Sequence, residues 1–219
     1  MAVAAPTPTP RNTEVKLQHI LRVSAQIFAA HGFEGTSMRD ISKATEISLS
    51  GLYYYFDSKQ RLLYLIQKNT FTFIVERLQE RLAGIDDPTA RLRALVQNHI
   101  DYFLSHPNEM KVLSHEEEAL ENPFRQEVAA IKRKYFALAR KIHEEVVREA
   151  AHSVFNERVA VLSLFGMMNW VYQWHKPGID PGADELTDTI VGIFLRGVSA
   201  ASGKFGNLPT TVPSEVHSE

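Results

Sequence analysis

The sequence predicts an all-α protein of about nine helices, with a small three-helix head followed by a larger helical domain. Apolar residues recur at the three- and four-residue spacing of helices along most of the chain. Serine, proline and glycine interrupt that spacing at the places where helix caps and ends require them. No alternating apolar and polar run bounded by turn residues indicates a strand.

Three short helices and the start of a fourth are expected by residue 60. The first has an apolar stripe that ends at Gly32, which tolerates the left-handed conformation of a helix end. The next three helices begin at serines whose hydroxyls can cap them, namely Ser37, Ser48 and Ser58. The fourth helix is expected to continue to about Leu82. Residues 13–60 therefore form the predicted head.

Five further helical segments are expected within a larger domain, residues 61–202. They run from Pro88 to near His106, over 110–120, from Asn122 to about Ala151, from Val154 to His175 and from Asp184 to Ala201. Proline suits the first turn of the helices that begin near residues 88 and 123. Residues 1–12 and 203–219 lack a periodic apolar pattern, and we expect a disordered arm and a disordered tail there.

Composition excludes several classes of protein. The chain of 219 residues has no cysteine, which excludes disulfides and thiolate metal sites. No run approaches the roughly 18 apolar residues of a membrane helix, and no secretory signal opens the chain. We therefore expect a cytoplasmic protein with no membrane contact. Residues 1–68 hold eight basic and five acidic residues, so the head is positively charged although the whole chain is at −2.

The stretch from Thr36 to Phe56 has the dimensions of a helix-turn-helix, two short helices joined by a tight turn. Leu49, Ser50 and Gly51 are small or apolar enough to approach base edges, and the tyrosines that follow carry hydroxyls that can reach phosphates. Taken alone, such an aromatic run is more typical of packing than of DNA contact. Over the whole register, however, residues 20–65 resemble the TetR family of one-component repressors.

That resemblance implies a DNA-binding head and specific contact residues. They are Ser37, Arg39, Ser48, Leu49, Ser50, Gly51, Tyr54, Tyr55 and Lys59. Ser37 would bind phosphate, Arg39 would contact a base, and Lys59 would bind phosphate at the start of the fourth helix. Two departures stand out. Glu46 occupies a turn position where the family usually has glycine, and Ser50-Gly51 replaces the frequent Gly-Thr, so base preference cannot be carried over.

Residues 66–201 are rich in large apolar side chains. Most of them, taken singly, predict the core of a helical bundle, and together they can line an apolar cavity. In the TetR family this domain usually binds a small molecule. The candidate pocket residues are Phe71, Ile74, Leu78, Tyr102, Phe103, Leu113, Phe136, Met167, Trp170 and Trp174.

The stretch from Gly166 to Gly178 resembles the penultimate helix of TetR-type repressors of fatty-acid and sterol side-chain catabolism, whose effectors are acyl-CoA thioesters. A CoA ligand needs cations near the pocket mouth for its phosphates. One predicted helix carries the candidates Arg125, Lys132, Arg133 and Arg140. The alternative, which such a composition favours, is a solvated charged face.

The last two predicted helices also suit self-association, because they place small and apolar residues at helical spacing. The candidate interface residues are Leu162, Phe165, Gly166, Ile190, Phe194 and Gly197. In the family these two helices pair with their twofold mates as a four-helix bundle. A homodimer would present two heads to a near-palindromic operator in double-stranded DNA.

Catalysis is not supported. The nine histidines are scattered, and neither a His-Glu-x-x-His pair nor a phosphate-binding glycine loop nor a Gly-x-Ser-x-Gly elbow occurs. We expect no catalytic residues, no metal and no cofactor. The preferred hypothesis is a dimeric repressor released from DNA by an apolar effector, with an acyl-CoA as the first choice. The alternatives are a DNA-binding activator or architectural regulator without an effector, and an enzyme on a helical bundle.

Overall fold

The computed structural model describes residues 10–116, 118–149 and 156–198. Within those ranges every regular element is a helix, so the predicted all-α fold is confirmed. The helices are α1 (Pro10–His31), α2 (Met38–Thr45), α3 (Leu49–Tyr55), α4 (Lys59–Leu82), α5 (Pro88–Ser105), α6 (Pro107–His115), α7 (Phe124–Glu149), α8 (Glu157–Asn169), α9 (Val171–Trp174) and α10 (Ala183–Val198). The predicted tail, and the predicted arm apart from the start of α1, lie outside the described residues.

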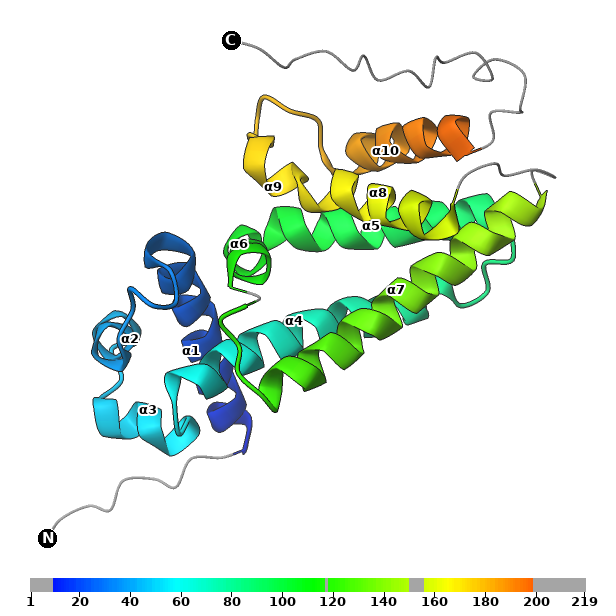
Figure 1. Ribbon diagram of the computed structural model, residues 1–219. Coiled ribbons are helices and arrows are strands. Elements are labelled where there is room, and N and C mark those ends of the chain that lie inside the picture. The colour runs from blue at the N-terminus through cyan, green and yellow to red at the C-terminus, as the bar shows by residue number, and fades with distance from the viewer. Residues whose placement is uncertain (1–9, 117, 150–155, 199–219) are drawn as a thin grey trace, which may run out of the picture.

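Helices α1, α2 and α3 form a head at one end of the molecule, and α4 runs from the head into the body (Figure 1). Gly32 ends α1 in the left-handed conformation, with a φ of 75°. Ser37, Ser48 and Ser58 each accept a backbone N–H from the following turn. The three predicted serine caps are therefore confirmed, and they fix where α2, α3 and α4 begin.

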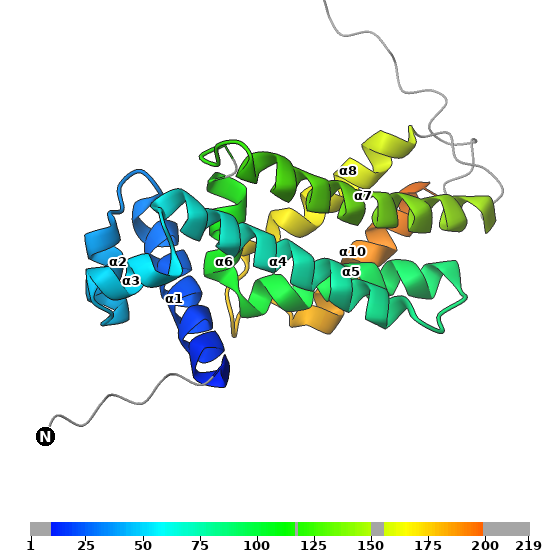
Figure 2. The same cartoon turned by 90° about the horizontal axis from the view of Figure 1, so that it is seen from below.

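The body is built on the long helices α4 and α7, which lie side by side, with α5, α8 and α10 packed above them (Figures 1 and 2). Helix α5 is central, because it packs against α4, α7 and α10. Its residues Leu92, Leu95 and Val96 are fully buried at helical spacing. These three positions form one apolar face, which α5 turns toward the bundle.

The core of the head is completed by residues from the body. Val112 of α6, Leu120 of the following loop and Val128 of α7 are buried in the same cluster as the apolar residues of α1 to α4. Helix α6 thus packs against α1 and α4 as well as α5 (Figure 2). Because packed interiors have few voids, a displacement of α6 must be transmitted to the head.

The single helix expected over residues 154–175 is instead two helices, which corrects that prediction. Helix α8 ends at Asn169, and α9 is a single turn that ends at Trp174. The last turn of α8 contains Gly166 and Asn169, both weak helix formers. The N–H of Trp170 donates back to the carbonyl of Gly166 at 3.3 Å and closes the helix there.

Among the described residues, no helix has both the length and the apolar content that crossing a bilayer requires. The same ranges bring together no group of three His, Asp or Glu side chains suited to a metal ion.

Candidate DNA interface and effector cavity

The N-terminal end of α3 lies at the surface of the head. The hydroxyl of Ser48 accepts the N–H of Gly51 at 3.1 Å and lies 3.2 Å from the hydroxyl of Ser50. Ser48 and Ser50 are exposed, while Leu49 and Gly51 are half-buried. The four predicted contact residues of this helix therefore form one small, hydroxyl-bearing end of the kind that can enter a DNA groove.

The opposite side of α3 is fixed by packing. Leu52 and Phe56 are buried in the head core, as a recognition helix requires. A Cβ atom at Gly51 would lie 2.9 Å from Cγ2 of Ile47, which is shorter than real Cβ contacts. Glycine at position 51 therefore lets α3 lie close to the turn that precedes it.

The two candidates at the start of α2, Ser37 and Arg39, differ in whether their side chains already form hydrogen bonds within the head. The Asp40 carboxylate accepts the N–H of Ser37 at 2.9 Å, and the Ser37 hydroxyl accepts the N–H of Asp40 at 3.3 Å. The hydrogen bonds from the side chain and backbone of Ser37 hold the pKa of Asp40 below its ordinary value. The Ser37 hydroxyl thus already caps α2, whereas Arg39 is exposed to solvent.

The tyrosines at the end of α3 are not equivalent. Tyr54 is 78% exposed, and Tyr53 is also exposed. Tyr55 is half-buried. The rings of Tyr54 and Tyr55 meet edge to face, with their centroids 5.2 Å apart. Tyr53 and Tyr54 are therefore accessible on the surface of the head, and the ring of Tyr55 packs against that of Tyr54.

Lys59 joins α4 to the loop between α1 and α2. Its ammonium donates to the carbonyl of Phe33 at 2.7 Å and to the carbonyl of Thr36 at 3.0 Å, and it lies 4.1 Å from the centre of the Phe33 ring. An ammonium has three N–H donors, so one remains for a phosphate. The structure thus gives Lys59 a role within the head that its position in the sequence did not indicate.

The turn between α2 and α3 contains a conformational strain. Glu46 has a φ of 58°, in the left-handed region that glycine tolerates and other residues seldom adopt. The Ser42 hydroxyl donates to the carbonyl of Ile47 at 2.7 Å and closes the turn around it. The departure from glycine noted in the sequence therefore falls on a position where glycine would fit better.

A cavity of about 470 Å³ lies in the body between α4, α5, α6, α7 and α8. Its lining residues are Phe71, His99, Phe103, Met110, Leu113, Ser114, Lys132, Tyr135, Phe136, Leu162, Phe165 and Asn169. Four of the candidate pocket residues are among them, namely Phe71, Phe103, Leu113 and Phe136. The volume is within the range of small-molecule sites, about 300–1,000 Å³. We call this space the effector cavity.

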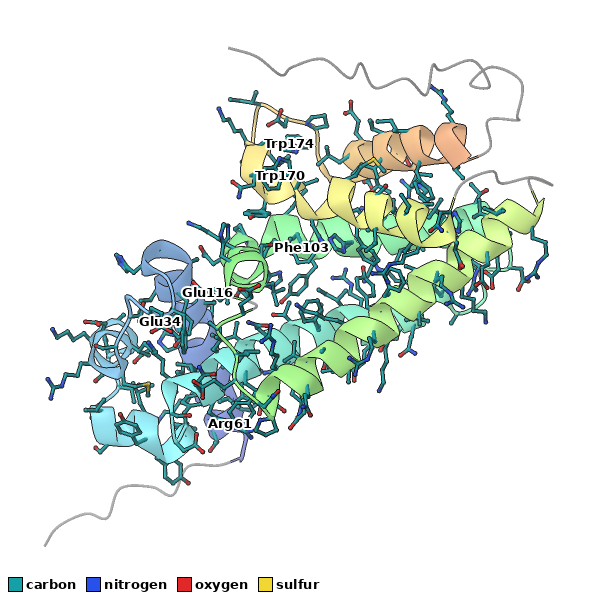
Figure 3. All side chains as sticks on the ribbon, viewed as in Figure 1. Glu34, Arg61, Phe103, Glu116, Trp170 and Trp174 are labelled. Carbon is teal, nitrogen blue, oxygen red and sulfur yellow. The ribbon has the colours of Figure 1, made fainter. Side chains whose placement is uncertain are left out.

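The other six pocket candidates lie elsewhere. Ile74 and Leu78 are buried in the body core, and Met167 packs against that core. Trp170 and Trp174 are 61% and 43% exposed, and neither lines the effector cavity. Figure 3 labels both beside α9, on the upper side of the body, while Phe103 lies on α5.

Tyr135, one of the large apolar side chains of residues 66–201, lines the effector cavity together with His99, which was not a candidate. The Tyr135 hydroxyl lies 3.0 Å from Nδ1 of His99, and both side chains are buried. Burial raises the pKa of Tyr135. Burial also lowers the pKa of His99 to about 3, against a smaller opposite effect of the Asn169 side chain. The two residues are 36 positions apart, so no local pattern indicates that they meet.

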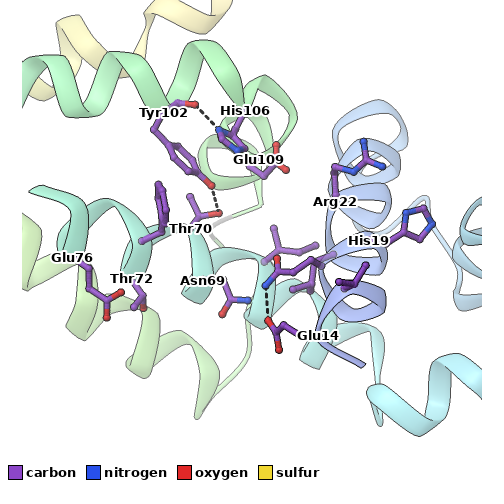
Figure 4. Close-up of a pocket in the computed structure, with 15 residues that line it drawn as sticks. Glu14, His19, Arg22, Asn69, Thr70, Thr72, Glu76, Tyr102, His106 and Glu109 are labelled. Carbon is purple, nitrogen blue, oxygen red and sulfur yellow. Dashed lines mark hydrogen bonds between the residues drawn. The ribbon is translucent and has the colours of Figure 1, made fainter. Parts of the chain in front are cut away.

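A second, larger cavity of about 790 Å³ lies between α1, α4 and the junction of α5 with α6 (Figure 4). Its walls are more polar, and they include Glu14, Arg22, Glu76 and Glu109. The remaining pocket candidate, Tyr102, belongs to this wall, where its hydroxyl donates to Thr70 at 3.2 Å. Burial raises the pKa of Tyr102 to about 12. We call this space the head groove.

Helix α6 links the effector cavity to the head. Met110 and Leu113 line the cavity, whereas Val112 between them is buried in the head core. Just after α6, the carboxylate of Glu116 accepts the backbone N–H of Phe33 at 2.9 Å, and its carbonyl accepts from Gln67 at 3.0 Å. Glu116 lies at the boundary between head and body in Figure 3.

The candidate interface residues lie in three different settings. Leu162 and Gly166 on α8, and Gly197 on α10, are exposed. Ile190 and Phe194 are buried within their own chain, and Phe194 is only 5% exposed. Phe165 lines the effector cavity. The exposed apolar side of α10 carries Ile193, which helical spacing also selects and which is 58% exposed. Val159 and Leu162 of α8 are exposed as well, and because α8 packs against α10 we call these three residues the α8–α10 face.

The basic residues of α7 also separate by position. Lys132 lines the effector cavity and lies 5.0 Å from the centre of the Phe71 ring. Arg140 forms ion pairs with Glu144 and Glu157, each at 3.2 Å. Arg125 and Arg133 are exposed. Of the four CoA-phosphate candidates, Lys132 is therefore the one that lines the effector cavity.

Both parts of the chain match known protein families. Residues 20–64 match the family described as bacterial regulatory proteins, tetR family. Residues 85–198 match the family described as tetracyclin repressor-like, C-terminal domain. The first match covers the head, and the second covers most of the body.

Individual relatives span nearly the whole chain. The HTH-type transcriptional repressor KstR2 of Mycolicibacterium smegmatis is 22% identical over 200 residues, which cover 89% of this chain and 96% of KstR2. A TetR-family regulator from Bordetella parapertussis superposes with a TM-score of 0.76 at 28% identity, over 82% of this chain and 93% of that one. AibR in complex with isovaleryl coenzyme A and operator DNA superposes with a TM-score of 0.72 at 27% identity, over 81% and 97%.

Proposed function

Because this chain belongs to the TetR family of bacterial regulatory proteins, we propose that it is a dimeric transcriptional repressor that an acyl-CoA releases from its operator. The observation that carries the proposal is the dual position of α6. The helix lines the effector cavity with one side and completes the head core with the other. A ligand in the cavity can therefore act on the DNA-binding surface through direct packing.

The DNA-binding part rests on the exposed end of α3 and its surroundings. Ser48, Leu49 and Ser50 contact base edges, and Arg39 adds a guanidinium from α2. Tyr54 and Lys59 bind phosphates and set the register without selecting sequence. Pairing of two chains through the α8–α10 face presents two heads to two half-sites of a near-palindrome.

An acyl-CoA fits the chemistry of the effector cavity. Five phenylalanine and tyrosine rings and the side chains of Met110, Leu113 and Leu162 provide an apolar surface for an acyl chain, and Lys132 supplies a cation that can approach a phosphate. The structure of AibR, at 27% identity, contains isovaleryl coenzyme A together with operator DNA. We carry that ligand class, but not that particular ligand, to this chain.

Release follows from differential affinity. An effector that binds only the DNA-incompetent state must favour it by about 2.7 kcal/mol to lower operator occupancy a hundredfold. Burial of a few methylene groups, at about 0.8 kcal/mol each, is enough to supply that difference. The effector shifts Met110 and Leu113, and α6 carries the shift to Val112 and Glu116 at the head.

A mobility-shift series tests the proposal. The operator is first selected from genomic fragments with the full chain, and it is then titrated with CoA and with acyl-CoA thioesters of increasing chain length. Thioesters should release the operator, whereas free CoA, which lacks the apolar part, should not. Replacing Phe136, which lines the cavity and is only half-buried, by Ala should weaken release and leave operator binding intact, with the exposed Glu118→Ala as the control. If no thioester releases DNA, the acyl-CoA part fails. A complex insensitive to every effector would favour an architectural regulator.

A further inference from the structure

The head groove differs in charge from the effector cavity. Three glutamates on three different helices line it, Glu14 of α1, Glu76 of α4 and Glu109 of α6 (Figure 4). Arg22 is the one lysine or arginine among its lining residues, so three negative charges face one positive charge when the histidines are neutral. The lining of the effector cavity contains Lys132 and no acidic residue. The two spaces therefore suit ligands of opposite charge.

The three carboxylates are not neutralised within the part of the chain that the structure describes. The ion pairs found there all join other residues. Glu14 accepts an N–H from the neutral side chain of Gln18 at 3.1 Å. Burial, with a smaller contribution from the charge of Glu109, raises the pKa of Tyr102 to about 12. The groove thus has a negative potential that a bound cation would relieve.

Two aromatic rings in the groove indicate an organic cation rather than a metal ion. Phe73 is 46% exposed, and its ring lies 5.5 Å from that of Tyr102, measured between centroids. The face of such a ring attracts ammonium groups within about 6 Å. Within the described ranges no three acidic or histidine side chains lie close enough together to hold a metal ion. Dispersed carboxylates around an exposed ring fit a larger cation with an apolar body.

Two buried hydroxyls on the wall of the groove lack a hydrogen-bond acceptor. Thr70 and Tyr102 are 4% and 6% exposed, and their hydroxyls lie 3.2 Å apart. The bond between them uses one hydroxyl proton, so the other proton has no acceptor among the residues that the structure describes. Buried polar groups are nearly always paired, so a ligand that fills the groove should supply the acceptor. The charge of Glu109 nearby disfavours an anionic acceptor there.

We propose that the head groove binds an organic cation that also carries a neutral hydrogen-bond acceptor. The ammonium group lies among the three glutamates and against Phe73, and the acceptor faces the hydroxyls of Thr70 and Tyr102. Helix α1 belongs to the head and the other walls belong to the body, so the ligand contacts both parts. The inference does not depend on the acyl-CoA proposal, because the two spaces share no lining residue.

Calorimetric titration of the full chain at neutral pH tests the charge preference with benzylamine, benzyl alcohol and benzoate. Benzylamine, as an ammonium ion, should bind at least about fivefold more tightly than the other two. Glu76→Gln and Phe73→Leu, both on exposed residues, should each weaken benzylamine binding by about two- to fivefold. Glu80→Gln, exposed on α4 but outside the groove, and Phe136→Ala in the effector cavity should leave it unchanged.

A second titration tests the acceptor with ligands that differ by one ether oxygen. At least one of 3- and 4-methoxybenzylamine should bind about threefold or more tightly than the corresponding ethylbenzylamine, because the oxygen pairs a buried hydroxyl. The double variant Thr70→Val with Tyr102→Phe should remove that preference. Equal affinities for benzylamine and benzyl alcohol, or benzylamine binding that neither Glu76→Gln nor Phe73→Leu weakens, would overturn the cation site. Equal affinities within both ether and ethyl pairs would overturn the role of the hydroxyls.

Discussion

The carboxylate of Glu116, at the end of α6, accepts the backbone N–H of Phe33, at the end of α1, over 2.9 Å. The bond joins residues 83 positions apart and crosses from the body to the head. Phe33 also supplies one of the two carbonyls that hold the ammonium of Lys59. The loop after α1 is therefore hydrogen-bonded to the body through Glu116 and to the start of α4 through Lys59.

Replacing Glu116 by Ala should weaken communication between the effector cavity and the DNA-binding surface. Hydrogen bonds to charged groups contribute about 1.5–3 kcal/mol, which is comparable with typical allosteric coupling energies of about 1–3 kcal/mol. We expect the effector-induced loss of operator affinity to fall at least fivefold, on the order of 1 kcal/mol of coupling, while effector affinity stays nearly constant.

The measurement is operator affinity by fluorescence anisotropy, with and without effector. Glu118→Ala is the matched control, because Glu118 is exposed and should leave the coupling unchanged. Unaltered coupling in Glu116→Ala would mean that α6 transmits the signal through packing at Val112 alone.

The fold was predictable because its signals are local. Ser37, Ser48 and Ser58 cap the helices that they were expected to cap, and Gly32 ends α1. Each of these features depends on a few neighbouring residues, which a sequence contains in full. The division of the predicted 154–175 helix was missed because an apolar stripe continues across the break at Trp170.

The cavity lining and the association surface were less predictable, because both depend on which faces of distant helices meet. Helical spacing identifies Ile190 and Phe194 as apolar, and Ile193 equally so, but it does not say which side of α10 faces the body. The structure buries the first two and exposes the third. His99 on α5 and Tyr135 on α7 meet only because both helices pack in the same bundle.

Replacing Glu46 by Gly should stabilise the head. A left-handed conformation costs a non-glycine residue about 1–2 kcal/mol, and Glu46 has a φ of 58°. After the added freedom of glycine in the unfolded chain is subtracted, we expect a gain of about 0.5–1 kcal/mol in the free energy of unfolding. Urea denaturation measures it. Glu80→Gly, within α4, should instead destabilise by about 1 kcal/mol, and the same sign for both variants would contradict the strain at Glu46.

Arg39 and Lys59 should separate DNA binding from head stability. Arg39→Ala removes an exposed guanidinium, so it should cost about 1–3 kcal/mol of operator affinity and relax specificity at one base pair per half-site, without changing the melting temperature. Lys59→Ala also removes bonds to two carbonyls, so it should lower both the melting temperature and the affinity for all sequences. Anisotropy on specific and scrambled duplexes, together with calorimetry, distinguishes them. Equal melting temperatures would exclude the structural role of Lys59.

Ile193→Asp should yield folded monomers. It places a carboxylate on the α8–α10 face, where pairing of two chains would have to desolvate it. Phe194→Asp, one residue away, should instead unfold the body, because Phe194 is buried beside the ring of His143. Sedimentation velocity and circular dichroism make the comparison. Ile179→Asp, between α9 and α10, is an exposed control that should remain dimeric. A dimer of Ile193→Asp would remove this face from the interface.

His99 should make the free energy of unfolding depend on pH in a definite direction. Its pKa is about 3 in the folded chain against an ordinary value of 6.5, so between these values the unfolded chain binds a proton that the folded chain does not. Stability should therefore be highest above about pH 6.5 and fall as the pH decreases toward 3, by up to about 1.4 kcal/mol per pH unit.

His99→Phe should remove this contribution and flatten the profile. Urea denaturation at about pH 7.5 and about pH 5 measures the slope, and the exposed His19→Phe should keep the wild-type slope. Part of the slope should persist in His99→Phe, because burial lowers the pKa of His143 as well. Parallel profiles for His99→Phe and the wild type would mean that His99 binds its proton equally well in the folded and unfolded chains, which would contradict the effect of burial.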